Sequence, residues 1–318
     1  MNFRSLHIDD LPVEVFQQVD VFIAQEPVGF VSAKRYRADL ARRTFRPEWT
    51  WIAEDEGRIV ARAVWWGRPD GTRPLLLDCL WTDSSARDRA GLAARLLGAA
   101  HRCFQEQHGD QLPEAFRMTL QNGWRADPAS REAVAWRQGA AAAAGFTHAV
   151  ERLQFEWTPA CGVPEADDRL IFVAEPDDDK MVEVFRRIGD GSLDDETRKK
   201  RARLSPGEAA RHEMQFYLDA PGERGWWRVV YQPDGLLAGL AIPSATAYNA
   251  NVGYLGVVPE MRGRGYARII LDAITRSHVN RGAEQITATT DVGNFPMATA
   301  FRKSGYRNVE TRLLLSAP

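Results

Sequence analysis

The 318-residue chain repeats part of its own sequence, and the repeated segments follow one another in the same order. Residues 13–16, 51–61 and 145–153 resemble residues 182–185, 228–238 and 305–313, respectively. Three matches in one order indicate an internal duplication, so the two halves are expected to share a fold. Residues 158–164 contain two prolines and one glycine, which is typical of a linker. We therefore predict one domain over residues 1–158 and a second over residues 168–318.

Strand-like and helix-like segments alternate through each half. In the second half, apolar periodicity and turn residues predict strands at residues 170–174, 227–231, 236–242, 251–258, 285–290 and from 306 onward. They predict helices at residues 180–188, 206–218, 268–280 and 295–304, with Ser205 capping the second of these. This mixture predicts an α/β (α+β) class, in which helices cover a mixed, mostly antiparallel sheet in each domain.

Composition excludes several classes of protein. The chain has 41 Lys and Arg against 43 Asp and Glu, so it lacks the basic excess of a nucleic-acid-binding protein. No apolar run approaches the ~18–20 residues that span a bilayer, and residues 1–10 lack the apolar core of a secretory leader. The three cysteines and six histidines show no metal-ligand spacing. We expect a cytoplasmic protein with no metal and no nucleic-acid or membrane partner.

A glycine- and arginine-rich turn stands between a predicted strand and a predicted helix, at residues 259–267. Glycines let the backbone approach a ligand, and the first amides of a helix lack partners and lie at its positive end. The turn therefore predicts a cradle for a pyrophosphate, with Arg262, Arg264 and Arg268 adding charge-assisted contacts. A basic RNA-binding turn is the alternative, and the near-neutral charge of the chain argues against it.

The turn resembles a known family. Residues 262–267, Arg-Gly-Arg-Gly-Tyr-Ala, match the Arg/Gln-x-x-Gly-x-Gly/Ala motif of the GNAT superfamily of acyl-CoA N-acyltransferases. Val257-Val258-Pro259 before the motif is similar to that family, as is Asn294 followed by a helix and Gly305-Tyr306. The resemblance covers residues 170–315 well and residues 3–157 weakly. It implies two tandem GNAT-like domains, each with a splayed pair of fourth and fifth strands, and acetyl-CoA or a short acyl-CoA as co-substrate.

The resemblance also implies roles for single residues. The backbone of Leu255 and Val257 is expected to pair with the pantetheine arm, and the Val257 amide to stabilise the developing oxyanion. Asn294 is expected to bind the pantetheine, and it can also cap the helix that follows it. The backbone amides expected to hold the pyrophosphate are those of Gly263, Arg264, Gly265, Tyr266 and Ala267.

The chain departs from the family at the residue that protonates the leaving thiolate. The family has a Tyr beside the bound co-substrate at the position of Phe301, and Phe has no proton to donate. Tyr254 and Tyr306 are the nearest aromatic hydroxyls that could replace it. Asp291 and Glu260 are the candidates for the base that takes the proton of the amine. Core packing of the two tyrosines and solvation of the two carboxylates are the alternatives.

The acceptor side has a weaker sequence signal. Asp190, Asp194 and Asp195 lie in an acidic loop between the first two helical segments, and Tyr248 precedes the fourth strand. By resemblance to the family, these residues are expected to line the acceptor pocket, where the carboxylates attract a cationic amine. The alternative is a solvated turn whose acidic residues interact with the positive end of the following helix.

The first half retains little of the motif. Residues 83–93 keep only Gly91 and Ala93, and Asp83 and Asp88 would repel a pyrophosphate. We therefore predict a degenerate first domain and a second domain that acetylates a primary amine of a small molecule or short peptide by direct transfer. A non-catalytic acyl-CoA-binding sensor or scaffold is the alternative, and Phe301 favours it. The sequence leaves a homodimer open.

Overall fold

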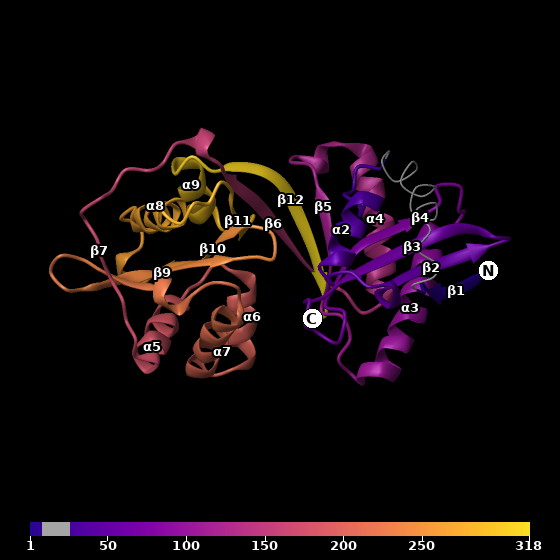
Figure 1. Cartoon of the computed structure of the whole chain (residues 1–318), viewed down its shortest axis with the longest axis horizontal. Coiled ribbons are helices and arrows are strands. Elements are labelled where there is room, and N and C mark those ends of the chain that lie inside the picture. Colours follow the sequence, from indigo (N-terminus) through magenta and orange to yellow (C-terminus); the bar gives the residue numbers. More distant parts are fainter. Residues whose placement is uncertain (8–25) are drawn as a thin grey trace. The chain divides into compact units, whose positions relative to one another are not determined.

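The computed structural model describes residues 1–7 and 26–318, which divide into two compact units (Figure 1). The first unit consists of residues 1–151 together with 310–318, and the second consists of residues 152–309. The repeat segment at residues 13–16 lies outside the described residues. Each unit is a mixed sheet with helices against it, which confirms the predicted fold class.

In the first unit the strands follow the order β1-β2-β3-β4-β5-β12, and the β4–β5 pair is parallel whereas the other pairs are antiparallel. The strands are β1 (Asn2–Ser5), β2 (Thr50–Asp55), β3 (Arg58–Trp66), β4 (Leu76–Thr82), β5 (Ala115–Leu120) and β12 (Arg307–Ser316). The described helices are α2 (Ala33–Ala41), α3 (Arg89–His108) and α4 (Pro128–Ala143).

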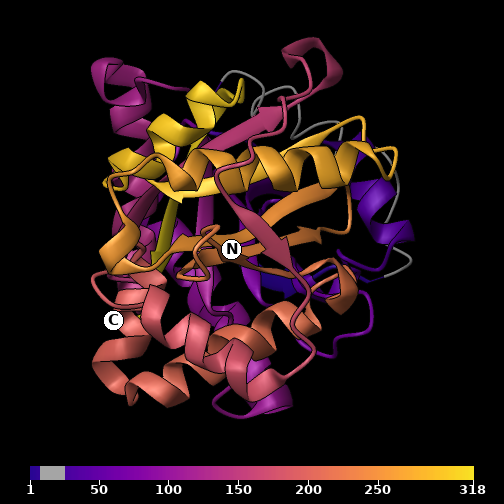
Figure 2. The ribbon, with the colours of Figure 1, turned by 90° about the vertical axis from the view of Figure 1, so that its left-hand side faces the viewer.

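The second unit repeats this pattern. Its strands follow the order β7-β8-β9-β10-β11-β6, and the one parallel pair is β10–β11. The strands are β6 (His148–Trp157), β7 (Ile171–Val173), β8 (Arg228–Tyr231), β9 (Leu237–Ala245), β10 (Ala250–Val257) and β11 (Ile286–Asp291). The helices are α5 (Asp178–Ile188), α6 (Asp195–Arg203), α7 (Pro206–Asp219), α8 (Tyr266–Val279) and α9 (Phe295–Lys303). Figures 1 and 2 show α8 and α9 on one face of this sheet and α5, α6 and α7 on the other.

The two halves of the sequence exchange their last strands. Residues 152–157 of β6 pair with β11 in the second unit, and residues 311–316 of β12 pair with β5 in the first. The side chains of Phe155 and Trp157 are buried in the core beneath α8 and α9. The units therefore do not coincide with the domains at 1–158 and 168–318 that the repeats predict.

Candidate functional site

The parallel strands of the second unit separate after a short paired stretch. β10 and β11 pair at residues 250–251 and 286–287, and beyond these residues β10 pairs with β9 and β11 with β6. The register of β10 against β9 shifts between Asn251 and Tyr254, where Gly253 has a φ of +71°. A glycine in this left-handed conformation at a bulge redirects the strand. We call the unpaired region between β10 and β11 the splay.

Backbone amides of β10 face the splay. The Val258 N–H donates to the Ala238 carbonyl on β9 at 3.0 Å. Because successive residues of a strand direct their backbone groups to opposite sides, the N–H groups of Leu255 and Val257 lie on the side away from β9. These are the two residues for which the sequence predicts backbone contacts to a pantetheine arm.

The glycine-rich turn leaves the start of α8 open. A short 3₁₀ turn, Pro259–Met261, follows β10, and Gly263 and Gly265 then adopt left-handed φ values of +78° and +80°. A Cβ placed on either glycine would meet no atom within 4 Å, and no side chain caps α8. The first amides of α8 are therefore accessible to an anion. The exposed side chain of Arg264 precedes them, and that of Arg268, in the first turn of α8, pairs with Asp272 at 3.4 Å.

Arg262 has partners other than those the sequence predicts. Its guanidinium donates to three backbone carbonyls: Val257 at 3.1 Å through Nε, Gly191 at 3.0 Å and Ile188 at 2.8 Å. The side chain thus joins the end of β10 to the end of α5 and to the loop after it. We assign it to holding this loop against β10. The Arg262 N–H donates to the Pro259 carbonyl at 3.2 Å, so neither the side chain nor the amide is open to the phosphate contact that the sequence predicts.

In the first unit, a carboxylate of the chain itself occupies the position that corresponds to the open start of α8. Helix α3 follows β4 as α8 follows β10, and Asp88 caps α3 by accepting the Gly91 N–H at 2.7 Å. A Cβ on Gly91 would lie 2.0 Å from the Asp88 carboxylate, so the space above the first amides is filled. A diphosphate would have to displace this carboxylate.

Asp291, a predicted base, is held by two partners. Its carboxylate accepts the Arg152 Nε–H at 2.9 Å and the Asp195 N–H at 2.7 Å. Burial raises the pKa of Asp291 above its usual value, and Arg152 opposes that shift. The carboxylate therefore fastens the start of α6 to the end of β11. Sequence reasoning missed Arg152, because it belongs to the strand that the first half contributes.

Tyr254 lies among aromatic rings on the face of β10 that carries α5 and α7. Its ring centroid is 5.1 Å from that of Phe185 and 5.6 Å from that of Tyr217. Burial, with the charge of Glu213 as the next cause, raises the pKa of Tyr254 well above its usual value. Its hydroxyl therefore stays protonated near neutral pH and releases its proton less readily than a free phenol does.

The predicted acceptor residues fall in two separate places. Asp190 pairs with Arg201, and the Asp194 carboxylate caps α6 by accepting the Thr197 N–H at 2.8 Å. Asp195 forms ion pairs within α6. Tyr248 precedes the start of β10, whereas the acidic loop is joined to the end of that strand through Arg262. The acidic residues therefore neutralise neighbours and cap a helix, and Tyr248 lies apart from them.

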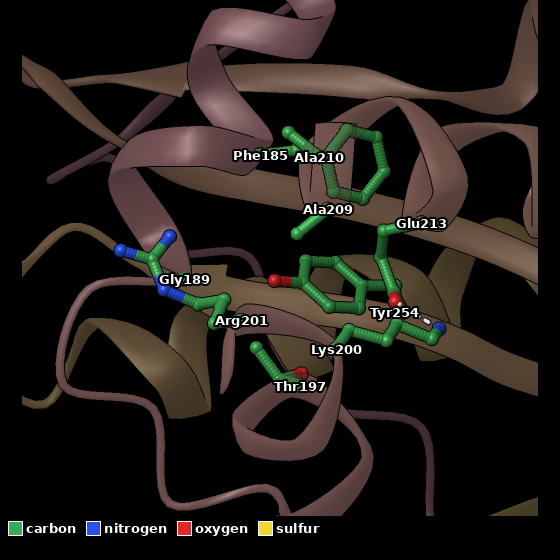
Figure 3. Close-up of a pocket in the computed structure, with 9 residues that line it drawn as sticks. All are labelled: Phe185, Gly189, Thr197, Lys200, Arg201, Ala209, Ala210, Glu213 and Tyr254. Carbon is green, nitrogen blue, oxygen red and sulfur yellow. Dashed lines mark hydrogen bonds and ion pairs between the residues drawn. The ribbon is translucent and has the colours of Figure 1, made fainter. Parts of the chain in front are cut away.

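A small pocket with both apolar and polar lining residues, which the sequence did not predict, lies between α5, α6, α7 and β10 (Figure 3). It encloses a cavity of ≈ 20 Å³, which is about the space that one water molecule needs. Its polar lining comes from Thr197, Lys200 and Arg201 on α6, Glu213 on α7 and Tyr254 on β10. Lys200 and Glu213 form an ion pair at 2.6 Å. No local pattern indicated this pair, because its residues lie 13 positions apart on two helices.

The other predicted site residues have structural partners. Asn294 caps α9 by accepting the Met297 N–H at 3.3 Å, and Glu260 pairs with Arg187. The Tyr306 hydroxyl is buried and bonded to Thr275 at 2.8 Å.

Phe301 is a core residue. Its side chain is buried, its ring stacks on Phe155 at 4.7 Å between centroids, and the Tyr306 ring lies 5.3 Å away. Its aromatic contacts thus come from β6 and from the residue just before β12, which places the ring inside the core that these elements share with α9.

Two further features follow from the described residues alone. Among residues 1–7 and 26–318, no group of His, Cys, Asp and Glu side chains has the arrangement of a metal site. None of the helices in that part of the chain is long and apolar enough to cross a membrane.

Comparison with known proteins finds a family model that matches part of the second unit. Residues 194–306 match the family model described as the acetyltransferase (GNAT) family. No curated protein sequence matches the chain. A GCN5-related N-acetyltransferase from Sphaerobacter thermophilus has a similar structure, with 16% identity and a TM-score of 0.59 over 99% of this chain and 94% of that one.

Two other solved structures share the fold. A tandem GNAT protein from the clavulanic acid biosynthesis pathway is 18% identical, with a TM-score of 0.50 over 99% of this chain and 98% of that chain. A glucosamine N-acetyltransferase region of a fungal multi-domain β-N-acetylglucosaminidase is 17% identical, with a TM-score of 0.53 over 99% of this chain and 38% of that chain. At these identities the similarity shows a shared fold. The tandem GNAT protein shares that fold over nearly the whole length of both chains.

Proposed function

We propose that the second unit, whose residues 194–306 match the GNAT acetyltransferase family model, moves an acetyl group from acetyl-CoA to a primary amine of a small molecule or short peptide. The observation that carries this proposal is the uncapped start of α8 beside the splay. Two left-handed glycines there leave backbone amides open to a diphosphate, directly after a strand whose own amides are unpaired on one side. The first unit serves as a degenerate copy, because Asp88 fills its corresponding position.

The residues present fit the co-substrate. The amides of residues 263–267, with Arg264 and Arg268 beside them, would hold the diphosphate. The Leu255 and Val257 amides would bond the pantetheine arm, as an added strand bonds a sheet edge. Acetyl-CoA supplies a thioester whose carbonyl carbon accepts the amine. The Val257 amide would stabilise negative charge that develops on the carbonyl oxygen.

The proton transfers are assigned to the chain's own side chains. Tyr254 would protonate the leaving thiolate, because a phenol is protonated near neutral pH and Tyr254 lies on β10, the strand whose Leu255 and Val257 amides face the splay. Asp291 is bound to Arg152 and to a backbone amide, so we assign it to fixing α6 rather than to taking the proton of the amine.

The three cysteines are free, which supports a cytoplasmic location.

A thiol-release assay with the full chain tests the proposal. We expect CoA to bind in isothermal titration calorimetry, and acetyl-CoA to release thiol in the presence of n-propylamine, putrescine or alaninamide. CoA binding without thiol release from any of these amines would favour the second candidate function, a non-catalytic acyl-CoA-binding sensor or scaffold. Absence of CoA binding would refute both functions.

We expect Phe301→Tyr to leave thiol release no faster than in the wild type and to lower stability by about 1–3 kcal/mol. The ring is 2% exposed and stacked on Phe155, so an added hydroxyl would enter the core rather than reach the leaving thiolate. Urea unfolding measures the stability change. Phe295→Tyr is the matched control, because it makes the same chemical change on the same helix where the ring is 72% exposed. Faster thiol release by Phe301→Tyr would contradict this placement.

A further inference from the structure

The pocket of Figure 3 lies next to the strand that faces the splay. Tyr254 lines the pocket and directly precedes Leu255, whose amide faces the splay. The Tyr217 hydroxyl donates to the Gly253 carbonyl at 3.4 Å and so joins α7 to the bulge of β10. Glu213 stands one helical turn before Tyr217 on α7. The carboxylate of Glu213 is thereby placed in a pocket that reaches β10 at the start of the splay.

Glu213 differs from the neighbouring carboxylates in its partner. Asp291 is bound to an arginine and a backbone amide, Asp194 caps a helix, and Asp190 is paired with an arginine. An arginine or a helix cap is a fixed partner, because guanidinium stays charged and the cap belongs to the fold. The Glu213 side chain is 15% exposed, and its ion-pair partner is the Lys200 ammonium at 2.6 Å.

Lys200 presents to Glu213 the same group that an acceptor would bring, a primary ammonium on an alkyl chain. Its side chain is 30% exposed and has four rotatable carbons, so it can leave the carboxylate at small cost. The same Nζ lies 5.7 Å from the centre of the Phe216 ring, so the ammonium contacts the carboxylate and the ring together. Phe216 is 53% exposed, so this side of the ion pair lies at the surface.

We propose that the acceptor amine binds in this pocket with its ammonium on Glu213, in the place that Lys200 holds, and that Glu213 takes its proton. This inference rests on the proposed function. The cavity itself is only ≈ 20 Å³, so the acceptor must enter the space that the Lys200 side chain leaves. A primary amine on an unbranched alkyl stem, as in lysine, fits that space.

The acceptor nitrogen loses two protons when its ammonium becomes an amide. The ammonium gives its first proton to Glu213, which releases it to solvent, and the neutral nitrogen then bonds to the thioester carbon. As the carbon–sulfur bond breaks, the leaving sulfur is protonated, and the nitrogen loses its second proton, so that amide and thiol are the products. The second proton of the nitrogen leaves to solvent, because the Tyr254 hydroxyl points toward Arg201 and away from the Glu213–Lys200 pair (Figure 3). Tyr254 remains the assigned donor to sulfur and regains its proton from solvent.

Three variants of the full chain test the pocket with n-propylamine, putrescine and alaninamide as probes. We expect Glu213→Gln to lower kcat/KM for the fastest of these amines about 100-fold or more, because both the ammonium contact and the proton acceptor are lost. We expect Lys200→Met to lower KM for the same amine, because the internal competitor is removed. Lys199→Met is the matched control, since it removes the adjacent charge outside the pocket, and it should behave as the wild type.

The outcomes separate this inference from the proposed function. All three variants should bind CoA within about twofold of the wild type, since none of the changed residues lies on the glycine-rich turn. An unchanged kcat/KM in Glu213→Gln, or equal losses in Glu213→Gln and Lys200→Met, would overturn the inference and make the pair a structural one. CoA binding with no thiol release from any of the three amines would overturn it as well. Failure of the wild type to bind CoA would overturn the proposed function, and this inference with it.

Discussion

Gly265→Asp is expected to weaken CoA binding by about 100-fold or more, whereas Gly265→Asn is expected to retain most of it. Both side chains enter the same backbone conformation, with φ at +80°, and Asn and Asp tolerate it better than other non-glycine residues. Both also enter open space, since a Cβ there meets nothing within 4 Å. The two variants therefore share their backbone strain and differ in one negative charge.

That charge would lie at the uncapped start of α8, where the diphosphate is expected to bind. At about 4 Å and an effective dielectric constant of about 20, repulsion between two unit charges is about 4 kcal/mol. Each 1.4 kcal/mol is a factor of about ten in affinity, so solvent screening still leaves a loss of about two orders of magnitude. The introduced carboxylate can also cap α8, as Asp88 caps α3 in the first unit.

Isothermal titration calorimetry with CoA measures the effect, and thermal unfolding checks that both variants are folded. The difference between the two variants should shrink as salt is added, because the repulsion is partly screened. Equal losses in both would assign the effect to backbone strain. Wild-type affinity in Gly265→Asp would show that the diphosphate binds elsewhere.

Local signals were sufficient to predict most of the second unit. The helix predicted at residues 206–218 spans Pro206–Asp219, and Ser205 caps it in a reciprocal arrangement with Glu208. The strand predicted at 285–290 spans Ile286–Asp291. Helix α8 begins at Tyr266, two residues before the predicted start, because its first residue follows a left-handed glycine rather than a side-chain cap. Periodicity and capping residues are properties of neighbouring positions, so a single sequence contains them.

Strand exchange was not predictable in the same way. The repeats mark β6 and β12 at equivalent positions of the two halves, but nothing local specifies which sheet each strand joins. That choice depends on contacts such as the stacking of Phe155 on Phe301, which joins residues 146 positions apart. The domain boundaries drawn from the linker therefore separate β6 from the sheet to which its residues 152–157 belong.

The candidate site likewise has a part that the sequence predicts and a part that it does not. Its backbone part, the turn with Gly263 and Gly265, follows from a short motif, because glycines at these positions permit the left-handed conformation. Its side-chain part depends on pairs from distant elements, such as Asp291 with Arg152 and Lys200 with Glu213. The roles proposed for single residues remain predictions that the experiments above test.

A fragment of residues 148–309 is expected to fold and bind CoA, whereas residues 159–309 are expected to do neither. The two fragments differ by β6, whose residues 152–157 pair with the whole of β11. Phe155 and Trp157 are 0% and 1% exposed in the core beneath α8 and α9. Loss of one such aromatic side chain costs about 3–5 kcal/mol, and a domain is stable by about 5–15 kcal/mol in all.

The larger fragment contains every strand of the second unit, since that unit is the continuous stretch 152–309. It should unfold cooperatively in urea and bind CoA with an affinity close to that of the full chain. Residues 168–318, the domain that the repeats predict, lack β6 and keep all of β12, so they should behave like residues 159–309. If residues 159–309 unfold cooperatively and bind CoA, then β11 does not need β6 as a neighbour. If residues 148–309 remain unfolded, the second unit depends on the first for its stability.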